Sequence, residues 1–566
     1  MLSTNSETVL ARYLSIGAGF VTLFVLAGPV SDPVNVTKLL MAGIVAFGVV
    51  PSFFNTKSKE LILSHKLLVG LLVLFTLLCL ISSFLSKAPF VQNFYGDSGR
   101  NTGFLTYLIL SLILLGSTLI SQSSSFKRIL SWFVIAGAIN VVLGYWAWIL
   151  GDPIPWNNIY GNLLGTFGNP NFMGAFMGMF SAVLAIFALS ESLELKWRIL
   201  SGAFWIFTVP ITLQTKAVQG VLLTLGGAGL AIWCYLYFKF RNKWVNNFYG
   251  TAFLSSAVLA VLGALQIGPL ARYIYKRSVS LRGSYWNAAI EMGSSNPFTG
   301  VGMDSYGTFY RQYRSENAAT DMPGPEIASN AAHSVPLDFL AFGGFPLFVV
   351  YLAILLIGFL SLVKVFRRKK YFDPVFLSLA IIWVTYQIQS LISINQLGLA
   401  IWGWVSTGAL VAYERITRDS SVLDDSKVPG KQKSVLKQEF VSPGLLAAVG
   451  SAVGILIAIP PLSADASYRN AIKYQNLEKL EAALVPSYFR PSNSRTLGNA
   501  VQILEESKLY DAGIKYAREG VKFNPMAFDA WKALYYSTNA TPEEKSKAKI
   551  KMIELDPFNY ALKDLS

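Results

Sequence analysis

Long apolar runs alternate with short polar segments along most of the chain. A hydrocarbon core of roughly 30 Å needs about 20 mostly apolar residues per helix, and about thirteen runs come near this length. They lie near residues 13–30, 34–54, 66–84, 104–121, 129–150, 171–190, 198–214, 218–238, 249–268, 335–361, 374–395, 397–414 and 441–459. Because the runs are continuously apolar and do not alternate residue by residue, they predict helices and not the strands of a barrel. The pattern predicts an all-α, polytopic membrane helix bundle of about 12–13 spans.

Composition supports a membrane protein. Hydrophobic residues make up 53% of the 566 residues and charged residues 14%, whereas an average soluble domain is about one quarter charged. The first run is long enough to span and no small-residue cleavage site follows it, so we expect an uncleaved anchor. Cys79 and Cys234 lie inside predicted spans, where we expect them to pack as small apolar residues and not to form a disulfide or metal site.

The distribution of basic residues predicts how the bundle is oriented. A net charge of +15 alone could indicate a nucleic-acid partner, but six alternate loops hold 21 of the Lys and Arg residues. They are Lys57, Lys59 and Lys66; Lys127 and Arg128; Lys196 and Arg198; Lys239, Arg241 and Lys243; the run Lys364 to Lys370; and Arg415 to Lys437. By the positive-inside rule these loops face the cytoplasm. We therefore expect a multi-pass protein of the cytoplasmic membrane, with a cytoplasmic N-terminus, contacts to membrane lipids and no nucleic-acid partner.

The chain changes character after Pro460-Pro461, where 28 of the last 103 residues are charged. We predict a transmembrane core over 1–414, a cytoplasmic linker over 415–440, a last span over 441–460, and an extracytoplasmic domain over 464–566. The linker's Asp424-Asp425 pair has no further ligands nearby, so we do not expect a metal there.

The motifs "VKFNP" and "IELDP" close two helical patterns 32 residues apart in the C-terminal domain. This spacing resembles that of tetratricopeptide helix pairs, whose usual period is about 34 residues. A helical hairpin domain of no particular family is the alternative, since the tetratricopeptide signature is incomplete. Stacked helix pairs present a concave surface, which would suit a protein partner or an acceptor.

The outer loop over 269–334 is far longer than the connections of a compact bundle, and loops of this length usually carry function. No phosphate-binding Gly-Lys loop, HExxH, CxxC or GxSxG motif occurs in the chain, which disfavours ATP-driven transport and familiar hydrolase chemistry. The loop instead reads "LRGSYWNAAIEMGSSNPFTGVGMDSYGTFYRQYRS" and closes with "NAAHSVPLDFLAFGG".

These segments resemble the O-antigen ligase and O-antigen polymerase superfamily of bacterial membrane glycosyltransferases. The matching positions are Arg282, Trp286, Pro297, Gly300, Gly302, Tyr306, His333, Leu337 and Gly344. "GTFGNPNFMGAFM", which contains Asn169 and Asn171, matches a family segment that enters a central span. Lys216 stands where the family usually has an arginine, and Arg100 matches another outer arginine. Ser334, Phe342 and Leu347 depart from the usual residues, which leaves open whether the chain is a ligase or a polymerase.

The resemblance implies a GT-C-like bundle that transfers a glycan from a polyprenyl diphosphate donor to an acceptor hydroxyl on a lipid, wall polymer or protein. Cations suit the charge that develops on the diphosphate as the glycosyl bond breaks, and Arg100, Lys216 and Arg282 are the candidates. A base with a pKa near the working pH must take the hydroxyl proton, and His333 is the candidate. The other histidine, His65, lies in a basic cytoplasmic loop and needs no function.

Other positions are expected to support the reaction. Asp338 lies just inside the span after His333, where an ionisable group is usually paired, and we favour an ion pair over an orienting role. Trp286, Tyr306, Asn169 and Asn171 are further candidates. We expect no cofactor and no metal, because the first outer loop offers Asp32 alone where metal-dependent relatives carry paired carboxylates.

Two other functions remain open. A repeat-unit polymerase or a protein O-oligosaccharyltransferase would use the same donor and site. A secondary transporter or lipid-linked sugar flippase would also have about twelve spans, but transporters usually show repeated halves with midplane polar residues, and no such symmetry is evident.

Overall fold

The computed structural model describes residues 4–156, 158–240, 242–264, 267–274, 277–418 and 441–565. These residues form helices with two isolated bridges and no β-strand, which confirms the all-α prediction. The first part contains α1 (Thr4–Leu23), α2 (Asn35–Val49), η1 (Val50–Phe54), α3 (Thr56–Ser64), α4 (Lys66–Leu85), α5 (Phe90–Tyr95), α6 (Phe104–Thr118), α7 (Ser123–Leu150), α8 (Pro170–Leu189), α9 (Leu195–Gln214), α10 (Val218–Phe240) and α11 (Lys243–Ala264). Next come α12 (Ala271–Ile274), α13 (Arg277–Ser295), α14 (Tyr306–Tyr313), α15 (Glu316–Thr320), α16 (Val335–Arg368), α17 (Pro374–Ser390), α18 (Leu397–Arg418) and α19 (Pro443–Ala458). The chain continues with α20 (Pro460–Lys473), α21 (Leu477–Leu484), α22 (Ser494–Glu506), α23 (Tyr510–Phe523), α24 (Phe528–Tyr536), α25 (Pro542–Leu555) and η2 (Tyr560–Leu562).

A helix overlaps each predicted apolar run, which confirms the prediction that the runs are helical. Within the described residues, six helices are long and apolar enough to cross a membrane, or seven if α19 and α20, bent by 49°, form one span. Two more apolar helices, α6 and α17, are shorter. The chain is therefore a polytopic membrane helical protein, while the larger number of spans stays a prediction.

α8 is the most enclosed of the spanning helices, with 83% of its apolar window buried. It packs against α9, α10 and α17. The backbones of Gly174 on α8 and Gly220 on α10 meet so closely that a Cβ on Gly220 would collide with Gly174. Small residues at such crossings let membrane helices approach closely. This packing fixes the centre of the bundle around which the outer segments are arranged.

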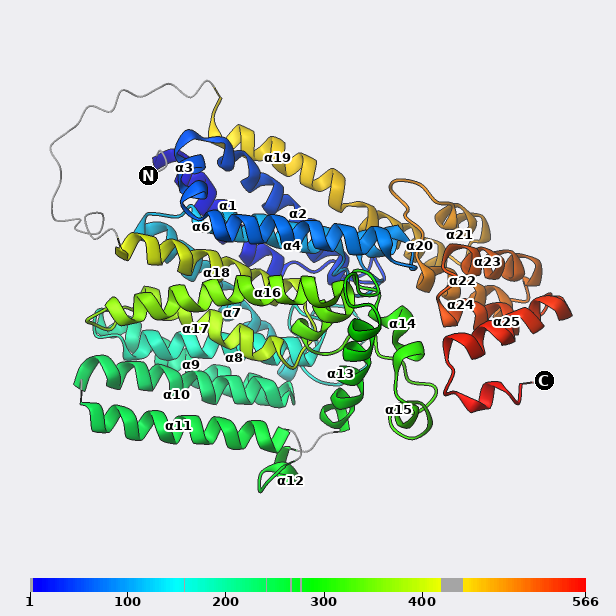
Figure 1. Cartoon of the computed structure of the whole chain (residues 1–566). Helices are drawn as coiled ribbons and strands as arrows, with labels where there is room; N and C mark the ends of the chain where they lie inside the picture. The colour runs from blue at the N-terminus through cyan, green and yellow to red at the C-terminus, as the bar shows by residue number, and fades with distance from the viewer. Residues whose placement is uncertain are drawn as a thin grey trace.

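The loops that carry the basic residues gather at one end of the bundle. Arg368 pairs with Glu414 at 2.6 Å, and Arg415 donates to the carbonyls of Thr118 and Ile120 at 2.7 and 2.8 Å. The N-terminus and α3 lie at this end, whereas α13–α15 and α20–α25 lie at the opposite end (Figure 1). The arrangement agrees with the predicted sidedness, although which end faces the cytoplasm stays a prediction.

A second hydrophobic core holds α20–α25 together, separate from the core of the bundle. Consecutive helices from α22 to α25 pack on one another, so helix pairs are present, while the tetratricopeptide likeness and the predicted domain limits stay predictions. Residues 419–440, with Asp424 and Asp425, lie outside the described residues.

Candidate functional site

The stretch 297–302 lies against a break in α16. The Val301 N–H donates to the Ala341 carbonyl at 2.8 Å, and α16 loses helical geometry where Gly344 has φ 66°. A Cβ on Gly300, which has φ 60°, would collide with the backbone of Ala341. Gly300 is therefore needed because two backbones pass in contact, whereas a Cβ on Gly302 would collide with the side chains of Ser86 and Asn93. This packing fixes the first two turns of α16 and the turn that precedes them.

His333 occupies that preceding turn in a left-handed backbone conformation, with φ 56°. Asp338, in the first turns of α16, accepts a hydrogen bond from the Ala332 N–H at 2.7 Å. The Tyr285 ring stacks on the imidazole, with centroids 5.2 Å apart. Asp338, for which an ion pair was the favoured expectation, instead holds the backbone of the histidine turn.

The hydrogen bond of the His333 ring defines its tautomer. Nδ1 lies 3.2 Å from the Ala331 carbonyl oxygen. A carbonyl can only accept, so Nδ1 carries the proton in this contact and the Nε2 lone pair is left to accept one. Burial lowers the pKa of His333 to about 4, with a further lowering by Arg100. The imidazole is therefore neutral near pH 7 and has the protonation state of a base.

Arg100 is presented by the turn between α5 and α6. The Asp304 carboxylate ties this turn down by accepting from the N–H groups of Asp97 and Thr102 at 2.8 and 3.0 Å. Burial raises the pKa of Asp304 to about 7. Arg100 itself donates to the side-chain oxygen of Asn330, which links it to the segment leading to His333. Burial lowers the pKa of Arg100, and the neighbouring Asp304 raises it in part.

Arg282 completes a cationic group around the histidine. Arg100 and Arg282 both lower the pKa of His333, so these three residues, from segments distant in sequence, are brought together. Arg282 and Trp286 are one turn apart on α13 and share a face. Among the described residues, Nε of Arg100, Nε of Arg282 and Nε1 of Trp286 are buried without a hydrogen-bond partner. Buried donors of this kind are usually satisfied, and ligand oxygens would satisfy them here.

Asn169 and Asn171 lie at the start of α8, near the turn that carries Lys216. The Asn169 side chain caps α8 by accepting from the Asn171 N–H at 2.8 Å. The Gln219 side chain donates to the Asn171 carbonyl at 2.8 Å, next to the α9–α10 turn where Lys216 is exposed with φ 54°. The two asparagines thus have a clear capping and packing role, and a contact of Lys216 with a donor stays a prediction.

Three residues make supporting contacts at the site. Of these, the sequence marked Tyr306 as a candidate without assigning it a role. Tyr306 is buried and donates to the Tyr285 carbonyl at 2.8 Å, which holds the ring that stacks on His333. Asp304 and Asn330 were not singled out. The signals for them were a carboxylate two residues after the glycine motif, and an amide three residues before the histidine.

Residues 171–352 match the family described as O-antigen ligase. The sequence matches none of the curated proteins compared with it. The matched region contains Arg282, the glycine motif and His333, and excludes Arg100 and helices α20–α25. Residues 171–352 are thus similar to the O-antigen ligase family, and this match supports the likeness of this membrane protein to the O-antigen ligase superfamily.

Proposed function

We propose that the protein transfers a glycan from a polyprenyl-diphosphate-linked donor to an acceptor hydroxyl, on the outer face of the cytoplasmic membrane. The observation that carries this proposal is a neutral histidine, held in a strained turn, beside two arginines whose buried Nε atoms have no partner among the described residues. The family match supports a membrane enzyme of the ligase or polymerase kind acting on lipid-linked oligosaccharide.

The reaction uses each group at a stated atom. Nε2 of His333 takes the proton of the acceptor hydroxyl as the oxygen attacks the anomeric carbon. The bond from that carbon to the diphosphate oxygen breaks, and the diphosphate leaves with the electron pair. Arg100 and Arg282 stabilise the charge that grows on the diphosphate, which favours the transition state over the ground state. Attack opposite the leaving group inverts the anomeric centre.

Donor binding also prepares the base. The two arginines lower the pKa of free His333, and an anionic diphosphate between them opposes that effect. The pKa of His333 therefore rises toward the working pH when the donor is bound, and the imidazole becomes a stronger base at the moment it is needed.

The test is a transfer assay with protein in lipid nanodiscs. Lipid-linked oligosaccharide from the source cells is mixed with candidate lipid, wall-polymer and protein acceptors. We expect transfer by the natural protein and a loss in kcat of about 10²–10⁴-fold in His333→Ala, the usual contribution of a general base. His65→Ala is the matched control, because His65 sits at the basic end of the bundle next to Arg415 and Arg418, and it should keep full activity.

The outcomes separate the candidates. Full activity in His333→Ala would contradict the catalytic assignment. Acceptor choice distinguishes ligase, polymerase and protein oligosaccharyltransferase. α16 is interrupted at Gly343 and Gly344, and interrupted helices are also found in secondary transporters. Absence of transfer, together with movement of the lipid-linked sugar across reconstituted vesicles, would therefore favour the flippase alternative.

A further inference from the structure

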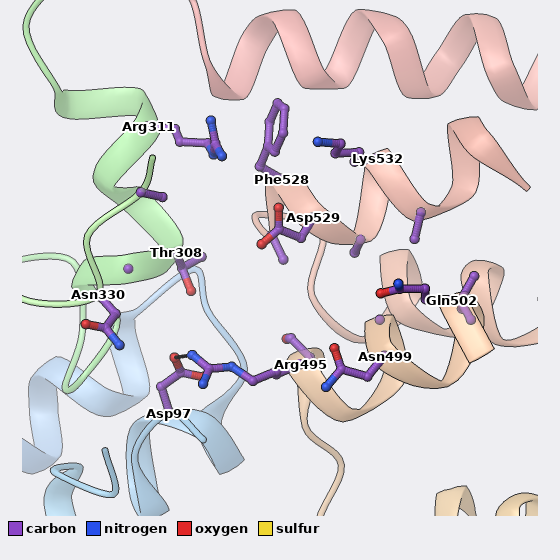
Figure 2. Close-up of a pocket in the computed structure, with 18 of the residues that line it drawn as sticks. Asp97, Thr308, Arg311, Asn330, Arg495, Asn499, Gln502, Phe528, Asp529 and Lys532 are labelled. Atoms are coloured by element: carbon purple, nitrogen blue, oxygen red, sulfur yellow. Dashed lines mark ion pairs between the residues drawn. The ribbon is translucent and has the colours of Figure 1, made fainter. Parts of the chain in front are cut away.

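A cleft of about 570 Å³ separates the C-terminal helices from the outer segments of the bundle (Figure 2). One wall comes from α14, the α5–α6 turn and residues 328–330, and the other from α22 and α24. Ligand sites occur preferentially at such boundaries between domains, in clefts of about 300–1,000 Å³. The O-antigen ligase match ends before α22, so the match assigns nothing to half of this cleft.

The lining is polar, mixed in charge and partly aromatic. Asn330 projects from one wall, and Asn499 and Gln502 project from the other. Asp97 and Arg495 face each other across the floor at 3.5 Å, and the Phe528 ring forms part of the far wall. Balanced charge does not suit a polyanion or a fatty chain. Amide groups both donate and accept, as sugar hydroxyls do.

The cleft adjoins the candidate catalytic group through one residue. Asn330 lines the cleft, accepts from Arg100, and lies three positions before His333 in the segment that leads to α16. A chain molecule in the cleft would thus contact a residue that also binds Arg100. This position is what a glycan that continues beyond the reacting sugar would occupy.

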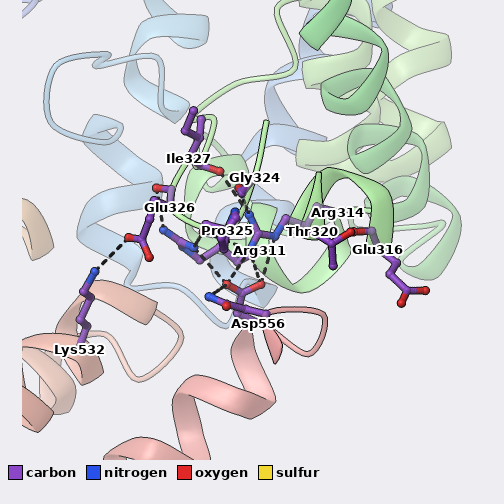
Figure 3. Close-up of polar contacts among 11 residues, drawn as sticks. Arg311, Arg314, Glu316, Thr320, Gly324, Pro325, Glu326, Ile327, Lys532 and Asp556 are labelled. Carbon is purple, nitrogen blue, oxygen red and sulfur yellow. Dashed lines mark hydrogen bonds and ion pairs between the residues drawn. The ribbon is translucent and has the colours of Figure 1, made fainter. Parts of the chain in front are cut away.

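The C-terminal wall is held in place by a buried ion pair. Asp556, at the end of α25, accepts three hydrogen bonds from Arg314, the C-cap residue of α14. Nη2 donates at 2.7 and 2.8 Å, and Nε donates at 3.1 Å (Figure 3). Arg311 joins the same carboxylate at 3.1 Å, and its guanidinium lies over the Phe528 ring, 4.4 Å from the centroid. The side chains of Arg314 and Asp556 are fully buried. The cleft is therefore a defined site and not a gap between loosely placed parts.

We propose that this cleft binds an oligosaccharide segment next to the reacting sugar, so that the C-terminal domain is part of the substrate site. The inference rests on the proposed function, and it adds the ligand class and the residues that hold it. Two sources share this chemistry, the glycan of the donor and the glycan of the acceptor, and the experiment separates them.

The first measurement is binding by saturation-transfer NMR, with the full chain in nanodiscs. One probe is the free oligosaccharide released by mild acid from the lipid-linked donors of the source cells, and the other is delipidated envelope glycan from the same cells. We expect at least one probe to bind, and about tenfold weaker binding in Asn499→Ala/Gln502→Ala, the loss of about 1.4 kcal/mol of hydrogen bonding. Asn470→Ala, which removes an exposed amide of α20 outside the cleft, is the matched control and should bind as the natural protein does.

The second measurement is transfer by the same variants. An increase in KM for the acceptor of about tenfold, with kcat within about threefold, identifies the acceptor glycan. The same change in KM for the donor identifies the donor glycan. If neither probe binds, or if Asn499→Ala/Gln502→Ala binds and transfers like the natural protein, the cleft proposal is overturned while the transferase function stands. If the natural protein binds glycan but transfers none, the proposed function fails and the cleft site survives.

Discussion

His333 holds a backbone conformation that residues with a side chain rarely adopt, and such strain costs about 1–3 kcal/mol. The surrounding contacts maintain it, since Asp338 holds the turn and Tyr285 covers one face of the ring. Strained residues of this kind cluster at functional sites. At the scale of single residues, the proposed function depends on the neighbouring charges that set the pKa of the His333 imidazole.

The influence of Arg100 on His333 can be measured directly. Removing the cation in Arg100→Gln should raise the pKa of His333 above about 4, because Arg100 now lowers it. The pKa of His65, which is lowered by burial, Arg415 and Arg418, should not change. Labelling the two histidines and titrating them by NMR checks this, with His65→Ala assigning the signals. An unchanged His333 titration would mean that the two groups are not neighbours.

The pH dependence of transfer follows from the same shift. Because the pKa of free His333 is about 4 and the neutral form is the base, kcat/KM, which reports the free enzyme, should stay level as pH falls through 6.5 and decline only near pH 4–5. The pKa that governs kcat should be higher, since bound diphosphate opposes the arginines. A decline in kcat/KM centred near 6.5 would instead indicate a solvated histidine.

At the scale of single residues, the sequence pointed to candidate catalytic groups more readily than to the residues that hold them in place. His333, Arg282 and Arg100 were candidates because their residue types and the family pattern suit the proposed reaction, and their roles stay predictions. Asp338 could not be assigned because its partner is a backbone N–H, which every residue except proline has. Lys216 lies in the turn next to Gln219, which contacts Asn171, and its contact with the donor alongside the arginines stays a prediction.

At the scale of elements, the site is built from turns held at their ends and not from side chains of one helix. The α5–α6 turn is tied by Asp304, and the first turns of α16 are tied to the stretch 297–302. These contacts join segments far apart in sequence. A pattern of apolar and polar positions therefore predicts the helices but not the hydrogen bonds between them.

Asp304 should act through the turn that carries Arg100. Asp304→Ala removes the acceptor for two N–H groups and should lower transfer by about tenfold or more, since small displacements of a charged contact are costly. Asp304→Asn keeps one carbonyl oxygen at this place and should recover most of the activity. Equal activity of the alanine variant and the natural protein, measured at saturating acceptor, would contradict this role.

The glycine motif should be sensitive to a single methyl group. Gly300→Ala combines a positive φ with a collision against Ala341, so it should cost about 2 kcal/mol or more of stability. Gly226→Ala on α10 is the control, because a Cβ there meets nothing within 4 Å and alanine favours a helix. Thermal unfolding of both variants in detergent should show a lower transition temperature for Gly300→Ala alone.

At the scale of the whole molecule, the two ends of the bundle differ. One end collects the basic loops, and the other carries α13–α15, the histidine turn and the C-terminal domain (Figure 1). The division was predictable, because loop charge and apolar runs are local properties of the sequence. The packing of α25 on α14 was not predictable. It depends on two arginines and an aspartate, which in the sequence look like ordinary charged surface residues.

Breaking the buried pair should loosen the domain. Asp556→Ala leaves Arg311 and Arg314 without their carboxylate, and removing one partner of a buried pair typically costs about 3–5 kcal/mol. Hydrogen exchange should then become faster across residues 310–330. Glu554→Ala breaks an exposed pair with Lys551 and should change nothing measurable. Identical exchange in Asp556→Ala and the natural protein would show that the pair does not hold the domain.

The distance along the chain between these partners has a consequence for the order of assembly. Asp556 follows Arg314 by 242 residues, so at about 5–20 residues per second the ribosome delivers the carboxylate roughly 10–50 s after the guanidinium. During that interval Arg311 and Arg314 lack their counter-charge. The C-terminal wall of the cleft is therefore completed late in synthesis, after the helices of the bundle have been made.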